Sequence, residues 1–209
     1  MTIAIIDCGS GNLHSVTKAL DVAASALNKR VILTTDTADV RSASHVVLPG
    51  VGAFGDCMAG LHALDGIREV LEEEVHQNGK PFLGICVGMQ MLFEKGMEHG
   101  EHAGLGWLKG TVSAMQLPER AKVPHMGWNN LQIKQKEHPL FKAIAEGEHV
   151  YFVHSYHATG TDAADMLATT DYYGELCACI GKNNMLGTQF HPEKSGKIGL
   201  QLLQNFCAM

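Results

Sequence analysis

The sequence lacks the features that mark a membrane protein or a nucleic-acid-binding protein. Its 209 residues contain no stretch of about 18 consecutive apolar residues, so no membrane-spanning helix is expected. The formal net charge is −6, and the Lys and Arg residues form no run. Because a fold that binds nucleic acid usually presents a basic face, a nucleic-acid partner is not expected either.

Signals of export and of metal binding are also lacking. No basic region precedes the first apolar run, so the amino terminus is typical of a buried strand and not of a signal peptide. The six cysteines include no C-x-x-C pair and are expected to be reduced thiols of a cytoplasmic protein. His99 and His102 flank Gly100 without further ligands, which favours a solvated loop. We expect no metal, no other cofactor and no nucleotide-binding loop of the G-x-G-x-x-G type.

The first half of the sequence alternates short apolar runs with amphipathic segments. The apolar runs predict strands buried on both faces of a parallel sheet, over residues 3–6, 31–34, 45–48 and 81–85. The amphipathic segments predict helices over residues 13–27, 53–64, 67–77 and 87–94, the first of them capped by Asn12. This alternation is typical of a doubly wound α/β sheet.

After about Gly104 the pattern changes to short strands at close spacing. These strands are predicted over residues 110–115, 129–133, 150–153, 166–170, 177–181 and 185–190, with a turn at 181–184. Their spacing favours antiparallel hairpins, and an amphipathic helix over 195–207 ends the chain. The predicted fold is α/β: a central, mixed but mostly parallel sheet flanked by helices, with an antiparallel extension. No linker or repeat interrupts it, so residues 1–209 are predicted to form one domain.

Cys86 is the candidate nucleophile. The segment 84–88 reads G-x-C-x-G between a predicted strand and a predicted helix, the thiol counterpart of the G-x-S-x-G nucleophile elbow. The sharp turn strains the backbone of the nucleophile, and flanking Cβ atoms would clash, so glycine is needed on both sides. The alternative is a small buried hydrophobe, which we expect of the other five cysteines; Cys177 and Cys179 would share one face of a strand.

His191 is the candidate base among the twelve histidines. A predicted strand leads directly to His191, Pro192 and Glu193, and strands of α/β sheets place functional groups at their carboxyl ends. Pro192 favours an extended His191, and residues i and i+2 of an extended chain point the same way. Glu193 is therefore predicted to hold the imidazole while its other nitrogen faces the sulfur. Without the cysteine elbow upstream, the sequence His-Pro-Glu could equally be a turn at the end of a strand.

Attack on an amide also requires N–H donors for the oxyanion. The backbone N–H of Val87 is one candidate, and the loop 49–52, with glycine at 50 and 52, could supply another or be an ordinary strand-to-helix loop. Gln90 could bind an amide or carboxylate. Glu98 could pair with a substrate ammonium or be a surface charge.

Several segments carry a resemblance to a known family. Class I, or triad, glutamine amidotransferases have motifs similar to GICVGMQ (84–90), PGVGAF (49–54) and GTQFHPEKSGKIG (187–199). Within that family, the glutaminase subunits of the imidazole glycerol phosphate synthases are similar at DCGSGN (7–12), VPHMGWN (123–129) and YFVHSY (151–156). Together these segments span nearly the whole chain in the family's order. Cys8 departs from the pattern, because the family usually has tyrosine there.

The resemblance implies a glutamine amidotransferase type 1 domain and a role for each matching residue. It implies a triad of the nucleophile Cys86, the general base and acid His191, and its partner Glu193. It places the oxyanion site at Val51, Gly52 and Val87, and L-glutamine at Gln90, Glu98, Ser155 and Tyr156. It also implies a heterodimer with a (βα)8-barrel synthase, or cyclase, subunit, contacted by Trp128, Tyr151 and Lys194.

The expected function is glutamine hydrolysis that supplies ammonia to the barrel subunit in histidine biosynthesis. That subunit would make imidazole glycerol phosphate and aminoimidazole carboxamide ribonucleotide. Two alternatives stay open. The first is an enzyme with the same triad and another role: a glutaminase of another class I system, such as those serving anthranilate, guanylate or pyridoxal phosphate synthesis, or a free hydrolase of γ-glutamyl bonds. The second is a non-catalytic subunit that has kept the fold.

Overall fold

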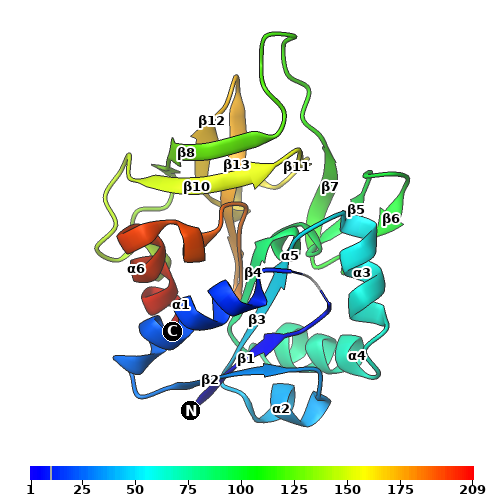
Figure 1. The fold of residues 1–209 in the computed structure, drawn as a ribbon, viewed down its shortest axis with the longest axis vertical. Helices are drawn as coiled ribbons and strands as arrows, with labels where there is room; N and C mark the ends of the chain where they lie inside the picture. Colours follow the sequence, from blue (N-terminus) through cyan, green and yellow to red (C-terminus); the bar gives the residue numbers. More distant parts are fainter. Residues whose placement is uncertain (10) are drawn as a thin grey trace.

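A mixed sheet of eight strands forms the centre of the molecule (Figure 1), in a computed structural model that describes residues 1–9 and 11–209. Ser10, part of the 7–12 motif, lies outside the described residues. The strand order is β2-β1-β3-β4-β14-β13-β12-β9. Parallel pairing joins the first five, which are β2 (Arg30–Thr34), β1 (Thr2–Ile6), β3 (His45–Gly50), β4 (Phe82–Cys86) and β14 (Met185–Thr188). Antiparallel pairing adds β13 (Glu175–Lys182), β12 (Met166–Asp171) and β9 (Gln132–Ile133).

The predicted α/β fold with an antiparallel extension is confirmed. Every residue of β3 and β4 is buried, which explains why these strands are continuous apolar runs in the sequence. The predicted hairpin of β13 and β14 is also present, with its turn at Asn183 and Asn184.

Helices cover both faces of the sheet. In Figure 1, α1 (Leu13–Ser25) and α6 (Gly196–Cys207) lie together on one side, and α3 (Phe54–His62) and α4 (Ile67–Leu71) lie on the other. The predicted helix over 67–77 is confirmed, although Glu72–Gln77 continues α4 as a π-helix. A short helix that was not predicted, α2 (Thr37–Ser42), begins where Asp36 accepts a hydrogen bond from the backbone of Ala38 at 2.8 Å.

Two smaller sheets stand beside the central one. The first pairs β10 (His149–His154) with β8 (His125–Asn130) in antiparallel register, and Tyr151 lies opposite Trp128. The second has the order β11-β7-β5-β6, from β11 (Tyr156–Thr159), β7 (Leu108–Ala114), β5 (Phe93–Gly96) and β6 (His102–Ala103). Strands β5, β6 and β11 were not predicted, because each is short; β6 has only two residues, and β11 finds its partner β7 more than 40 positions away.

Two predicted elements were wrong in extent. The helix expected over 87–94 is only α5 (Val87–Gln90), and Phe93 already begins β5. Apolar residues fill this segment, so periodicity cannot separate helix from strand, and pairing with β7 decides the outcome. The strand expected over 129–133 is divided between β8, which ends at Asn130, and β9 in the central sheet.

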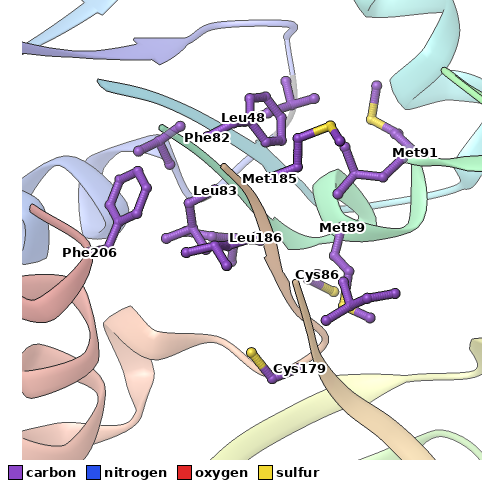
Figure 2. Packing of buried hydrophobic residues seen from close by; sticks show 14 of the residues in the cluster. Leu48, Phe82, Leu83, Cys86, Met89, Met91, Cys179, Met185, Leu186 and Phe206 are labelled. Carbon is purple, nitrogen blue, oxygen red and sulfur yellow. The ribbon is translucent and has the colours of Figure 1, made fainter. Parts of the chain in front are cut away.

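The core packs around the middle of β4. Figure 2 shows Leu83 and Leu186 from the adjoining strands β4 and β14, with Met89 of α5 and Cys86 close by. Cys86 is 4% exposed and belongs to this buried cluster. This packing fixes the backbone of Cys86.

Among the helices of residues 1–9 and 11–209, none is long and apolar enough to span a bilayer.

Candidate active site

Cys86 occupies a strained turn between β4 and α5. Its backbone dihedrals are φ 54° and ψ −110°, a combination that residues with a side chain rarely adopt. Such strain persists only where the surrounding structure imposes it, and it gathers at functional sites. The elbow predicted from the G-x-C-x-G pattern is therefore present.

Two glycines allow the turn to close. A Cβ on Gly84 would lie 2.5 Å from the carbonyl oxygen of Gly88. A Cβ on Gly88 would collide with the carbonyl oxygen of Leu48 on the neighbouring strand. Both obstacles are backbone atoms, which cannot move aside without displacing β3 or α5.

Replacing Gly88 by alanine is expected to destabilise the protein by about 3 kcal/mol or more, because overpacking against backbone cannot relax. Urea unfolding of the variant measures this change. Gly147→Ala is the matched control: Gly147 has φ +84° but open space around it, so alanine there costs only about 1 kcal/mol of backbone strain. Equal losses in the two variants would show that the close approach at Gly88 is unimportant.

His191 and Glu193 form a buried pair. His191 Nδ1 lies 2.7 Å from Glu193 Oε1, and the two side chains are 2% and 0% exposed. The backbone of His191 is held from β10, since its N–H donates to the carbonyl of Tyr151 at 2.9 Å. The predicted contact is present but its expected geometry was wrong, because Glu193 lies in the 3-10 turn Pro192–Lys194 rather than in extended chain.

Asn12 completes this arrangement. The prediction that Asn12 caps the first helix was correct in position, but its side chain makes no capping bond. Its Nδ2 instead donates to Glu193 Oε1 at 2.5 Å. A donor on the carboxylate holds the oxygen that faces His191, and this role was missed because the two residues are 181 positions apart.

The charge environment of His191 favours the imidazolium. Burial by itself lowers the pKa, but the proximity of Cys86 and the carboxylate of Glu193 outweigh it and raise the pKa of His191 to about 9. Its Nε2 is buried and has no hydrogen-bond partner among the described residues. This ring atom is therefore available for proton exchange with Cys86 and a bound molecule.

A cavity of about 530 Å³ brings most of the predicted site residues together. Cys86 and His191 both line it, as do the predicted oxyanion residues Val51, Gly52 and Val87. So do Gln90, Glu98, Ser155, Tyr156 and Lys194. Glu193 lies behind His191 and does not line the cavity.

Two of the predicted glutamine-binding side chains already have partners. Gln90 uses its Nε2 to donate to the carbonyl of Tyr156 and to Gln189 Oε1, each at 3.0 Å. Glu98 accepts the backbone N–H of Phe54, at the start of α3, through Oε2 at 2.8 Å. Glu98 is therefore fixed at the cavity wall and is not a solvated surface charge.

The expectation that the sequence contains no G-x-G-x-x-G loop was wrong, because residues 50–55 have this spacing between β3 and α3. In dinucleotide-binding folds the N–H groups at the start of the helix bind a phosphate. Here a carboxylate, that of Glu98, takes this position at Phe54. A pyrophosphate would meet its negative charge, so the arrangement opposes nucleotide binding.

Several further residues contact the site without having been predicted, among them Gln189 and Cys57. Gln189 lies two residues before His191, and its Nε2 is 3.8 Å from Cys86 Sγ. Cys57 Sγ is 3.5 Å from the carbonyl oxygen of Val51, and so contacts the expected loop 49–52 just after β3, which continues to Gly50. The pattern around His191 could have indicated Gln189, because alternate residues of a strand share a face.

Other buried cysteines are poor nucleophiles. Burial raises the pKa of Cys57 and of Cys177 to about 12, and that of Cys207 to about 11. Cys177 and Cys179 are buried in β13, as predicted for core residues. The thiols of these residues therefore stay protonated near neutral pH.

The three predicted interface residues lie together beside the cavity. Trp128 is 57% exposed, and its ring stands 6.1 Å from that of Tyr151, centroid to centroid. Lys194 Nζ lies 5.9 Å from the centre of the Tyr151 ring. An exposed tryptophan next to a cation and a cavity mouth is typical of a protein-binding surface.

Comparisons with known proteins agree with this geometry. The family model for class-I glutamine amidotransferases matches residues 4–209. The chain is 51% identical to imidazole glycerol phosphate synthase subunit HisH of Rhodospirillum rubrum, covering 99% of this chain and 98% of that protein. It is 49% identical to the subunits of the same name from Brucella suis biovar 1 and Agrobacterium fabrum, with the same coverage.

Solved structures of similar fold are more distant in sequence. One, described as a glutamine amidotransferase, has a TM-score of 0.73 at 15% identity and covers 99% of both chains. Another, described as a glutamine amidotransferase from Thermotoga maritima, has a TM-score of 0.65 at 19% identity, covering 92% of this chain and 76% of the other. At this identity the two structures support the fold alone.

Proposed function

The chain belongs to the class-I glutamine amidotransferase family, and from this we propose that it is the glutaminase subunit of an imidazole glycerol phosphate synthase. It would hydrolyse L-glutamine and pass the ammonia to a (βα)8-barrel synthase subunit in the cytoplasm. The observation that carries the proposal is the presence of the Cys86 elbow and His191 in one cavity, with Glu193 hydrogen-bonded behind the imidazole. The full-length similarity to synthase subunits supports the choice of partner.

Cys86 would act as the nucleophile. Its thiolate attacks the side-chain carboxamide carbon of glutamine, and the carbonyl oxygen becomes an oxyanion. The backbone N–H groups of Val87 and of the Val51–Gly52 segment are the candidate donors to that oxygen. His191 gives its proton to the leaving nitrogen, so ammonia departs and a γ-glutamyl thioester remains.

In the second half of the reaction, His191 acts as a general base instead of a general acid. Neutral His191 removes a proton from water, the resulting hydroxide attacks the thioester carbon, and glutamate leaves as Cys86 is regenerated. Glu193 keeps the imidazole oriented through both halves and stabilises its charged form. Asn12 acts on the same carboxylate and is a positioning residue.

The cavity offers complementary groups for the amino-acid end of glutamine. Both N–H groups of Gln90 are already used, so its Oε1 remains to accept a hydrogen bond from the substrate. Glu98 adds a negative charge that suits an α-ammonium group. Ser155 and Tyr156 also line the cavity and would contact the α-carboxylate.

Ammonia is a useful product only if it leaves unprotonated, so water has to be kept from its path. A barrel subunit seated on Trp128, Tyr151 and Lys194 would cover the cavity mouth and receive the ammonia. It would add the nitrogen to its phosphoribulosyl nucleotide substrate and release imidazole glycerol phosphate and aminoimidazole carboxamide ribonucleotide. The segment 49–52, which follows from the end of β3, is a natural switch, because rotation of one peptide would create or remove the oxyanion donor.

Glutamate release is expected to rise by at least about a hundredfold when the barrel subunit and its nucleotide are added, because only the complex assembles the oxyanion donors. Steady-state assays with and without each component measure this stimulation. A barrel-type subunit of a different synthase is the control and should give none. A free subunit that hydrolyses glutamine at the full rate of the complex would contradict the gating.

A further inference from the structure

A chain of hydrogen bonds enters the cavity wall from strand β8. Asn129 Nδ2 lies 3.2 Å from His125 Nε2. His125 Nδ1 lies 3.0 Å from His154 Nε2, and His154 Nδ1 lies 2.9 Å from the carbonyl oxygen of Tyr156. The proposed reaction uses neither histidine, although His154 lines the cavity.

The direction of every hydrogen bond in this chain is determined. The Tyr156 carbonyl can only accept, so His154 carries its proton on Nδ1 and accepts on Nε2. His125 must then donate from Nδ1 and accept on Nε2. The donor to it is the amide of Asn129, whose orientation is fixed because Nδ2 also donates to the Asp171 carbonyl at 2.9 Å.

Both histidines are held in the neutral state. They are 3% and 7% exposed, and burial lowers the pKa of His125 to about 4 and that of His154 to about 3. Protonation of either ring would replace its acceptor nitrogen with a second donor and break the chain. Near neutral pH both rings therefore carry their proton on Nδ1, and the hydrogen bonds all run in one direction, from Asn129 toward Tyr156.

On the far side of Tyr156 the chain continues to the nucleophile. The Tyr156 carbonyl also accepts from Gln90 Nε2 at 3.0 Å. Gln90 donates in turn to Gln189 Oε1 at 3.0 Å, and Gln189 Nε2 lies 3.8 Å from Cys86 Sγ. One carbonyl thus orients the histidine pair and the glutamine that faces the substrate.

We propose that His125 and His154 are a positioning pair, which fixes the Tyr156 carbonyl and through it Gln90, and ties this wall of the cavity to strand β8. The role rests on the proposed function, since Gln90 is taken to bind glutamine. Strand β8 also carries Trp128, so the pair joins the proposed partner surface to the substrate site. Loss of the pair should weaken glutamine binding more than it slows the chemical steps.

Packing alone does not explain the pair. The His125 ring stacks between Phe152 and Tyr172, with centroids 4.6 and 4.0 Å away. A phenylalanine would fill this place without burying polar nitrogens. His125→Phe and His154→Phe therefore keep an aromatic ring at each position and remove only the hydrogen bonds.

A double-mutant cycle in the complex with the synthase subunit tests the proposal. Each Phe variant is expected to raise the KM for glutamine about tenfold with less than about a threefold change in kcat, as for loss of one buried hydrogen bond. Because the two residues act through one carbonyl, the double variant should also show about a tenfold rise. A hundredfold rise would mean that they act independently, and an unchanged KM would remove the positioning role.

Three further measurements keep these outcomes distinct. His154→Asn retains a donor near the place of Nδ1 and should recover part of the lost binding. His157→Phe is the matched control on neighbouring β11: it should leave KM unchanged, since His157 Nδ1 has no partner among the described residues. Thermal melting of each variant separates a binding defect from unfolding.

The tautomers can be read without any activity. Nitrogen-15 NMR of the full chain should show both His125 and His154 protonated on Nδ1 near neutral pH, whereas free histidine favours Nε2 protonation. Finding either ring protonated on Nε2 would contradict the proposed direction of these hydrogen bonds. If the wild-type complex failed to hydrolyse glutamine while both Nδ1 tautomers were observed, the proposed function would fail and the hydrogen-bond chain would stand.

Discussion

Replacing Cys86 by alanine is expected to lower glutamine-dependent synthesis by the complex on the order of 10⁴-fold or more, while synthesis from added ammonium salts stays unchanged. In the proposed mechanism the thiol forms the bond to the carboxamide carbon, and its replacement by a methyl group leaves no nucleophile at that position. In the proposed mechanism the acceptor reaction belongs to the other subunit, so external ammonia would bypass the loss. Product formation with each nitrogen source measures both rates in one preparation.

The matched control is Cys177→Ala, which removes a buried thiol from β13, away from the described cavity. Both activities should survive in that variant. Loss of both activities in Cys86→Ala would instead mean that Cys86 is needed for folding or assembly. If the Cys86→Ala variant still supported synthesis from glutamine, this result would falsify the proposed chemistry.

Replacing Glu193 by glutamine is expected to lower glutaminase kcat by about a hundredfold to ten-thousandfold, as when a triad histidine loses its carboxylate. The amide keeps the size of the side chain but removes the negative charge that helps raise the pKa of His191 to about 9. The pKa of His191 should then fall, and less of the imidazolium that protonates the leaving amine is present at neutral pH. Glutamate release as a function of pH measures both effects.

The same pair makes a prediction for stability. The folded-state pKa of His191, about 9, lies above the usual value of 6.5, so the folded state binds the proton more tightly than the unfolded chain does. This stabilisation is fully present below about pH 6.5 and is lost as pH rises through about 9. Thermal melting between pH 6 and 10 should show that decline in the wild type and less of it in Glu193→Gln.

Glu146→Gln serves as the control for both measurements. Glu146 is half-exposed and pairs with Lys136 at 3.6 Å, and such surface pairs contribute little. Its pH profiles for activity and stability should match those of the wild type. If Glu193→Gln matched them as well, the carboxylate would have no role in orienting His191.

The sequence by itself determined the parts of the site whose signals are local. The elbow needs glycine two residues either side of Cys86, because backbone atoms occupy the space that a Cβ would fill at Gly84 and Gly88. His191 and Glu193 are close in sequence, so their contact could be predicted even though the turn between them was not the expected one. The buried parallel strands were equally visible, because burial on both faces leaves a continuous apolar run.

Tertiary structure alone decided the contacts between distant segments. Asn12 meets Glu193 across 181 positions, and no local pattern indicates this contact. Alternation along the strand that leads to His191 could have placed Gln189 on the face of the site, but its contact with Cys86, 103 positions away, depends on the pairing of β14 with β4. The pairing of His125 with His154 depends on the register of β8 against β10. The end of α5 at Gln90 was decided in the same way, because β5 gains its partner β7 only in the folded sheet. Short motifs indicate the candidate reacting groups. Which residues contact those groups depends on packing and strand register, and these cannot be read from a single sequence.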